Sequence, residues 1–311
     1  MKIVTSGARY IDIDAYACCI AYAELLQKQG IAARAVSEAV INQSVPALIR
    51  NWPTNLEAKY QPSSEDTFIL VDVSEPEYFE TFVDTERIDE VIDHHPGLED
   101  YWQERISEGA IIEQVGAACT QIFEKWERAG MLSEMSKESA GLLMCGILDN
   151  TLNFGAEITT DRDRHAYEEL NKVAQLSEDW AAQYFEACES EVVADLPQAV
   201  KDDTKTMRKF KSFDKPLAVG QLAVWSAPEL AVGSFDTLKS ALEEDQPFWF
   251  MNLISIKDGR SYFVTDVPEV QDWLTNLLGV EFDGNLAAAT RMWLRKEIMK
   301  ADILASTASK V

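Results

Sequence analysis

Two apolar runs in the first third of the chain end abruptly in acidic or histidine side chains. Residues 67–71 lead into Asp72, and residues 91–92 lead into Asp93, His94 and His95. Short, uninterrupted apolar runs are typical of strands that are buried on both faces of a parallel sheet. In open α/β sheets, ligands bind at the carboxyl edge of the strands. The pattern therefore predicts an α/β fold whose sheet edge gathers acids and imidazoles.

Strand-like and helix-like segments alternate through the first part of the chain, which favours a doubly wound parallel sheet. We expect its strands at 2–5, 31–36, 67–71, 91–93 and 110–115. We expect its helices at 15–29, 116–128, 136–150, 161–174 and 178–188. This first domain is predicted to cover 1–188.

The acidic stretch 189–195, closed by Pro197, is the expected domain boundary. Beyond it the sequence predicts a smaller α/β domain over 195–311. We expect helices at 197–210 and 286–300, and strands at 217–225, 248–256 and 261–266. The active cleft is expected between the two domains.

Charge and cysteine content limit the classes of partner. The formal net charge of −25 opposes binding to a nucleic acid duplex or an anionic membrane. A phosphate substrate would then need metal ions or clustered Lys and Arg.

The five cysteines form no C-x-x-C pair, so we expect buried thiols in a reducing cytoplasm. We find no leader-like start and no apolar run long enough for a membrane span.

Acids and histidines recur in a pattern that indicates metal or phosphate chemistry. Asp12 and Asp14 precede a helix, and Asp149 stands beside Asn150 near the end of another. Carboxylates combined with imidazole favour Mn²⁺ or a similar ion over Ca²⁺, which takes oxygen ligands. A single Asp is explained equally well as a helix cap. The set, together with Asp72 and the histidine pair, is better explained by bound cations.

These motifs resemble those of the DHH phosphoesterases. The signature Asp-His-His stands at 93–95, and residues 7–14 look like the family's Gly-His-x-x-Pro-Asp-x-Asp motif. Residues 71–75, 115–120 and 146–154 look like later family segments. The second half resembles the companion domain of manganese-dependent (family II) inorganic pyrophosphatases and exopolyphosphatases. There, 203–205 looks like Asp-x-Lys, and 294–296 looks like the terminal Ser-Arg-Lys.

The resemblance implies one or two bound ions, Mn²⁺ or alternatively Mg²⁺ or Co²⁺. It assigns the metal positions to Asp12, Asp14, Asp72, His94, Asn150 and, as a substitute for the last, Asp149. Asp72 would bridge the ions. His95 would be the catalytic acid, together with Asp93. The phosphate-binding residues would be Lys205, Arg295 and Lys296.

Two departures from the family pattern fall on metal positions. Ala8 stands where pyrophosphatases have a histidine ligand, and a methyl group cannot bind a metal. Asn150 replaces the last aspartate, and its neutral oxygen binds a divalent cation more weakly than a carboxylate does. Asp149 could replace it only with a shift of the backbone.

The leading functional hypothesis is metal-dependent hydrolysis of a phosphoanhydride, as in inorganic pyrophosphatase. One alternative is an exopolyphosphatase or nucleotide phosphodiesterase of the same superfamily. Another is a catalytically weakened phosphate or nucleotide binder, because Ala8 and Asn150 replace ligands. The expected partner is a small phosphate-containing substrate, with no nucleic acid duplex and no membrane, and the chain is compatible with a homodimer.

Overall fold

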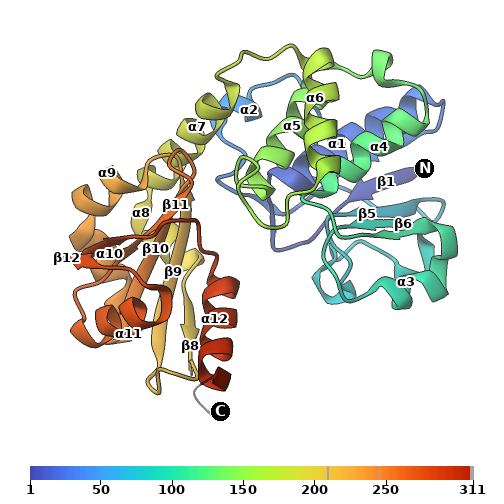
Figure 1. Cartoon of the computed structure of the whole chain (residues 1–311). Coiled ribbons are helices and arrows are strands. Elements are labelled where there is room, and N and C mark those ends of the chain that lie inside the picture. Colours follow the sequence, from blue (N-terminus) through green and yellow to red (C-terminus); the bar gives the residue numbers. More distant parts are fainter. Residues whose placement is uncertain (209, 245, 309–311) are drawn as a thin grey trace. The chain divides into compact units, whose positions relative to one another are not determined.

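The computed structural model describes residues 1–208, 210–244 and 246–308 and divides the chain into two compact units. The first is Met1–Tyr184 and the second is Phe185–Val311, and each is built around its own sheet (Figure 1). The division lies within helix α7 (Trp180–Ala194). Most of the expected boundary 189–195 therefore lies in a helix, and the units divide between Tyr184 and Phe185 instead. The glutamates of 189–195 are good helix formers, so acidity alone did not mark a break.

The sheet of the first unit has the order β3-β1-β5-β6-β7, and every neighbouring pair is parallel. Its strands are β1 (Lys2–Thr5), β3 (Ala33–Ala35), β5 (Thr67–Val71), β6 (Ile88–Asp93) and β7 (Ala110–Ile112). The order reverses between β1 and β5, as in a doubly wound sheet, and ligands bind at such a switch point. The predicted fold class is confirmed, although β3 and β7 are shorter than expected.

Helices cover both faces of this sheet, which explains the uninterrupted apolar strands. Helix α3 (Glu99–Ile106) places Trp102 against Ile3, Leu70 and Val91. The alternate residues of the strands are also fully buried, on the opposite face, where four helices pack together (Figure 1). These are α1 (Ile13–Lys28), α4 (Ala118–Arg128), α5 (Lys137–Asn150) and α6 (Asp161–Ala174).

Shorter elements complete the first unit. They are β2 (Tyr10–Ile11), β4 (Val40–Ile41), α2 (Ala47–Arg50) and the 3₁₀ turns Pro76–Tyr78, Thr85–Arg87, Ser107–Gly109 and Leu132–Glu134.

The second unit has a six-stranded sheet of order β12-β13-β11-β10-β9-β8, in which β9 and β10 are parallel and the other pairs antiparallel. The strands are β8 (Lys205–Met207), β9 (Leu217–Val224), β10 (Trp249–Ser255), β11 (Arg260–Val264), β12 (Phe282–Asp283) and β13 (Leu286–Ala288). One face packs on α8 (Leu196–Asp202), α9 (Ala227–Gly233) and α10 (Phe235–Glu243). The other packs on α11 (Pro268–Leu278) and α12 (Arg295–Ala308).

Two predicted helices of this unit are wrong in part. The helix expected at 197–210 ends at Asp202, and the next residues form the edge strand β8. The helix expected at 286–300 is instead strand β13 followed by α12, which begins at Arg295. The alanines at 287–289 favour a helix by propensity, but pairing of β13 with β11 overrides that preference.

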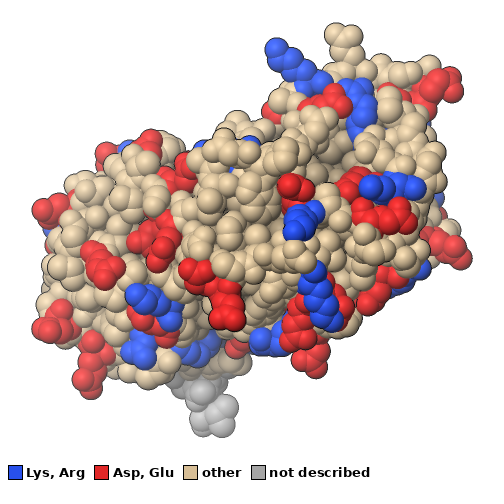
Figure 2. Space-filling view, turned by 90° about the horizontal axis from the view of Figure 1, so that it is seen from above, with Lys and Arg blue, Asp and Glu red and all other residues tan. Residues whose placement is uncertain are grey.

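Charged side chains are spread over the surface. On the face shown in Figure 2, acidic side chains are scattered and several Lys and Arg side chains lie among them. This distribution fits a well-solvated protein surface. Among the described residues, none of the helices has both the length and the apolar character that crossing a bilayer demands.

Helix α4 is attached to α1 by Trp126, which generates a stability prediction. Its fully buried indole N–H donates to the Ala21 carbonyl at 3.0 Å. Trp126→Ala should lower the free energy of unfolding by about 3–5 kcal/mol, because it removes a large buried side chain. Native-state hydrogen exchange of α1 and α5 amides measures this. Arg128→Ala, on the exposed face of the same helix, should change it by less than about 0.5 kcal/mol. Equal effects of the two would contradict the packing described.

Candidate metal centre

The start of α1 brings two of the predicted acids to the carboxyl edge of the first sheet. Asp12 is the N-cap residue, and its Oδ1 accepts from the backbone N–H of Ala15 at 3.1 Å. Asp14 lies in the first helical turn and not in a loop as expected, and it is fully buried. Burial raises the pKa of Asp12, and the charge of Asp14 raises it further. Both acids are stabilised by the positive end of the helix dipole.

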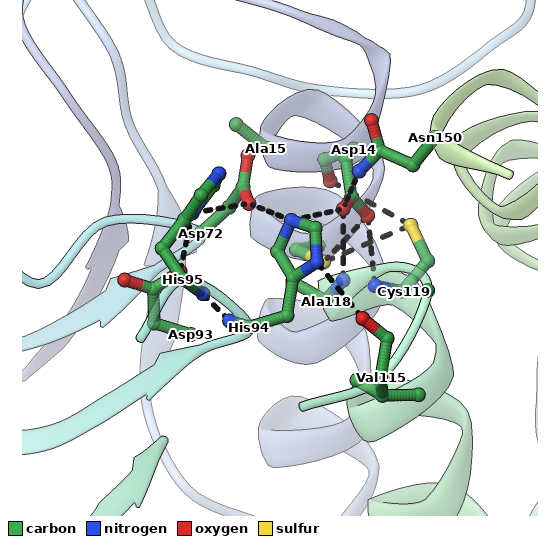
Figure 3. A network of polar contacts seen from close by, with 12 residues as sticks. Asp14, Ala15, Asp72, Asp93, His94, His95, Val115, Ala118, Cys119 and Asn150 are labelled. Carbon is green, nitrogen blue, oxygen red and sulfur yellow. Dashed lines mark hydrogen bonds and ion pairs between the residues drawn. The ribbon is translucent and has the colours of Figure 1, made fainter. Parts of the chain in front are cut away.

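Asp14 accepts hydrogen bonds from two backbone N–H groups, one side-chain amide and the Cys18 thiol (Figure 3). The backbone N–H of Cys119 donates to Oδ1 at 2.8 Å, and that of Ala118 donates to Oδ2 at 2.8 Å. The side-chain amide of Asn150 also donates to Oδ2. The first N–H groups of a helix have no partner within it, so the start of α4 is a natural anion site. Asp14 occupies that site.

A second buried acid, Asp163, holds the segment that leads into α4. It accepts from the backbone N–H of Gly116 and from the Thr120 hydroxyl at 2.6 Å. It also accepts from the backbone and hydroxyl of Thr160, both at 2.7 Å, in a capping box that starts α6. A Cβ on Gly116 would lie 2.6 Å from Asp163 Oδ2, so the segment needs glycine there. Sequence analysis missed this role, although Thr160-x-x-Asp163 is a recognisable capping signal.

Asp72 follows β5 and has a carboxylate oxygen that lacks a hydrogen-bond partner. Its backbone has φ of 56°, a left-handed conformation that Asp tolerates better than most residues. Its Oδ1 is buried, accepts no hydrogen bond, and lies 3.4 Å from His94 Nε2. Burial raises the pKa of Asp72, and the carboxylates of Asp14 and Asp12 raise it further.

His94 follows β6 and directs one ring nitrogen at two carboxylates (Figure 3). Its Nδ1 lies 3.1 Å from the Val115 carbonyl, which can only accept, so Nδ1 carries the proton in the neutral ring. Its buried Nε2 has no hydrogen-bond partner and lies 3.9 Å from Asp14 Oδ2. A histidine fixed through one nitrogen and open at the other is typical of a metal ligand. The donor set of Asp72 and His94 therefore fits a divalent cation.

Asp93 and His95 form a second pair beside this one. The Asp93 carboxylate accepts from the backbone N–H groups of His94 and His95 and from His95 Nδ1 at 2.8 Å. Burial acts to raise the pKa of Asp93, but the hydrogen bond from His95 holds it below its ordinary value. The same bond raises the pKa of His95. The His95 side chain is 56% exposed, so its ring is open to a substrate.

The last two predicted metal residues are directed elsewhere. Asp149 Oδ1 accepts from the Tyr184 hydroxyl at 2.9 Å, and burial raises the pKa of Asp149 to about 7. Asn150, one residue later on α5, donates to Asp14. Their assignment as metal ligands stays a prediction.

The three predicted phosphate-binding residues come together in the second unit. Arg295 is only 8% exposed, and its Nη2 donates to the backbone carbonyl and the carboxylate of Asp203. Its Nε and Nη1 are buried and have no partner. The Arg295 side chain lines a pocket of about 540 Å³ together with Asp203, Lys205, Met207, Gln221, Leu294, Lys296 and Met299. Unpaired N–H groups on a buried guanidinium favour binding of an anion. The expected active cleft between the units stays a prediction.

The cysteines behave as small buried side chains. Cys18, Cys19, Cys119 and Cys145 are buried, and Cys188 is half-buried. Cys18 and Cys119 lie 3.7 Å apart beside Asp14, and burial raises the pKa of both thiols. With Asp14 they form a group whose ligand atoms lie close enough together to hold a metal ion, which would take the thiols as thiolates.

Comparison with known proteins identifies relatives that cover about three quarters of the chain. Residues 2–147 match the DHH family, N-terminal domain. A probable manganese-dependent inorganic pyrophosphatase of Lactobacillus delbrueckii is 27% identical over 256 residues, covering 78% of this chain and 77% of that protein. A protein with the same description from Exiguobacterium is 28% identical over 247 residues, covering 78% and 74%.

Two solved structures share the fold. One is a Methanococcus jannaschii protein assigned to the family II inorganic pyrophosphatases, with a TM-score of 0.64 and 20% identity, covering 97% of this chain and 100% of that one. The other is an exopolyphosphatase-related protein of Bacteroides fragilis, with a TM-score of 0.54 and 15% identity, covering 99% and 92%. The match of residues 2–147 to the N-terminal domain of the DHH family agrees with the resemblance that the motifs carry.

Proposed function

We propose that the chain is a metal-dependent phosphohydrolase of the inorganic pyrophosphatase type. The observation that carries the proposal is the pair Asp72 Oδ1 and His94 Nε2, two buried acceptors 3.4 Å apart without hydrogen-bond partners. Buried polar atoms without partners are costly, and a carboxylate beside other carboxylates is more so. A divalent cation bound to both atoms would remove that cost.

The ion is proposed to be Mn²⁺, with Mg²⁺ and Co²⁺ as alternatives. The relatives described above are named as manganese-dependent, and a mixed nitrogen and oxygen donor set suits Mn²⁺. Asp72 and His94 would hold it, with Asp12 and Asp14 as the further predicted ligands. When bound, such an ion polarises a phosphoryl oxygen and lowers the pKa of water.

His95 is proposed to donate a proton to the leaving phosphate oxygen. Asp93 fixes the His95 ring through Nδ1, which leaves Nε2 to act on the substrate. Asp93 also stabilises the protonated ring, which keeps His95 able to act as an acid. In this role Asp93 fixes the orientation of the His95 ring and favours its protonated form, but it transfers no proton itself.

The basic pocket of the second unit is proposed to bind the phosphate groups. Arg295 offers unpaired N–H groups, and Lys205 and Lys296 add exposed positive charge. In a protein of net charge −25, such a local concentration of cations is needed to attract an anionic substrate. Cytoplasmic location and assembly as a homodimer stay predictions.

Two alternatives from the sequence remain, and a substrate panel separates them. Faster release of phosphate from polyphosphate or dinucleotides than from pyrophosphate would favour the exopolyphosphatase or phosphodiesterase assignment. Ala8 offers only a methyl group at a ligand position, and the Asn150 amide donates to Asp14. Both observations favour a weakened binder, which would bind pyrophosphate in calorimetry with Mn²⁺ and release no phosphate.

His95→Ala should lower kcat for pyrophosphate by about 10²–10⁴-fold, because it removes the general acid. The measurement is Mn²⁺-dependent release of phosphate at saturating substrate. His165→Ala is the matched control, since His165 is the remaining histidine and its exposed ring pairs with Glu127 away from the centre. Unchanged kcat in His95→Ala would reject the catalytic role.

Asp72→Asn should make the metal-free protein at least as stable as the wild type, because a buried charge next to Asp14 and Asp12 is removed. Asn also tolerates the left-handed backbone at this position. Mn²⁺ at 100 times its Kd should stabilise the wild type by about 2.7 kcal/mol and the variant much less. Thermal unfolding with and without Mn²⁺ tests this, and equal shifts would remove Asp72 from the centre.

Lys296→Gln should raise KM for pyrophosphate about tenfold with little change in kcat, because losing one charged hydrogen bond costs about 1.5 kcal/mol. Lys300→Gln is the matched control, since Lys300 is exposed on the same helix but does not line the pocket. Steady-state kinetics of both variants measures the difference. A KM equal to that of the control would place phosphate binding elsewhere.

A further inference from the structure

We infer that the metal centre holds one divalent ion per chain, on Asp72 and His94, and that Asn150 prevents the binding of a second. The inference rests on the proposed function for the presence of the first ion. It concerns the number of ions and the residue that sets it.

The proposed site of the first ion lies between Asp72 and His94. Asp72 Oδ1 and His94 Nε2 are both buried, both unpartnered and 3.4 Å apart. The carboxylate of Asp14 lies nearby, 3.9 Å from His94 Nε2, and supplies further negative charge. Among the buried atoms without partners, Asp72 Oδ1 and His94 Nε2 lie close to each other and beside Asp14.

Asp14 is already satisfied on the side that faces Asn150. A carboxylate oxygen has two lone pairs. On Oδ2 these are engaged by the backbone N–H of Ala118 at 2.8 Å and by Asn150 Nδ2 at 2.5 Å. The amide of Asn150 must present its NH₂ group here, because its oxygen would repel an ionised Asp14. A second ion on this side would have to displace Asn150 from Asp14.

The other predicted ligands on this side are engaged or lack a donor atom. Asp149 Oδ1 accepts from the Tyr184 hydroxyl, and Asp12 Oδ1 caps α1. Ala8 carries only a methyl group, and its backbone N–H donates to the Tyr78 carbonyl. On this side a second ion would find a remaining oxygen of Asp12, and the Cys18 and Cys119 thiols, which group with Asp14, could join only as thiolates. The Asn150 amide donates a hydrogen bond to Asp14 at the place where a second cation would otherwise bind the carboxylate.

This account predicts what an acid at position 150 would do. Asn150→Asp removes the NH₂ donor and places a carboxylate against Asp14. Repulsion between the two carboxylates would destabilise the metal-free protein. A cation bound between them would relieve that repulsion, so the variant should gain a second site.

The test is the number of Mn²⁺ ions per chain, measured on the full-length protein by equilibrium dialysis and elemental analysis. The wild type and Asp149→Asn should bind one ion, and Asn150→Asp should bind two. The metal-free Asn150→Asp variant should also melt at a lower temperature than the wild type and regain more stability on addition of Mn²⁺. Two tightly bound ions in the wild type, or one in Asn150→Asp, would overturn the inference.

The same measurements separate this inference from the proposed function. One ion per chain without release of phosphate would leave the inference standing and reject the hydrolase. Two ions with turnover would reject only the inference. If Asn150→Asp fails to fold, the wild-type count alone still decides between one and two ions.

Discussion

The structure of the first unit depends on how two buried carboxylates, Asp14 and Asp163, find donors. An unpaired buried charge would cost several kcal/mol, so each position is tolerable only with a full set of hydrogen bonds. Asp14 takes its donors from the start of α4 and from α5. Asp163 holds the segment before α4 in place through Gly116 and Thr120. The acids on α1 and α6 therefore fix the position of α4, and α4 fixes the orientation of Asp14.

Buried polar groups of this protein fall into two kinds. Those with hydrogen-bond partners hold the fold together, and those without partners mark the candidate metal site. Asp14 and Asp163 are saturated with donors, so their hydrogen bonds explain them. Asp72 Oδ1 and His94 Nε2 are equally buried and have none. Folding alone gives no reason to bury two acceptors against each other, because each loses water without a replacement. A bound cation would supply the missing partner, as the proposed function requires.

Sequence reasoning reached the fold and the main cluster because local patterns encode them. The apolar strands before Asp72 and Asp93 are continuous since helices cover both faces of the sheet, and parallel strands deliver their following residues to one edge. The partner of Asn150 was beyond reach, because Asp14 is 136 residues away and only the packing of α1 on α5 brings them together. Strands β8 and β13 were missed for a similar reason, since pairing within the sheet decides them and propensity does not.

The two units differ in which hydrogen-bonding groups lack partners, and this difference indicates which ligand each unit can bind. The first unit presents buried acceptors without donors at Asp72 and His94. The second presents buried donors without acceptors at Arg295, where Asp203 satisfies only one arm of the guanidinium. A cation alone would satisfy the first set, and an anion alone would satisfy the second. Under the proposed function, a divalent metal would fill the first role and a phosphate group the second.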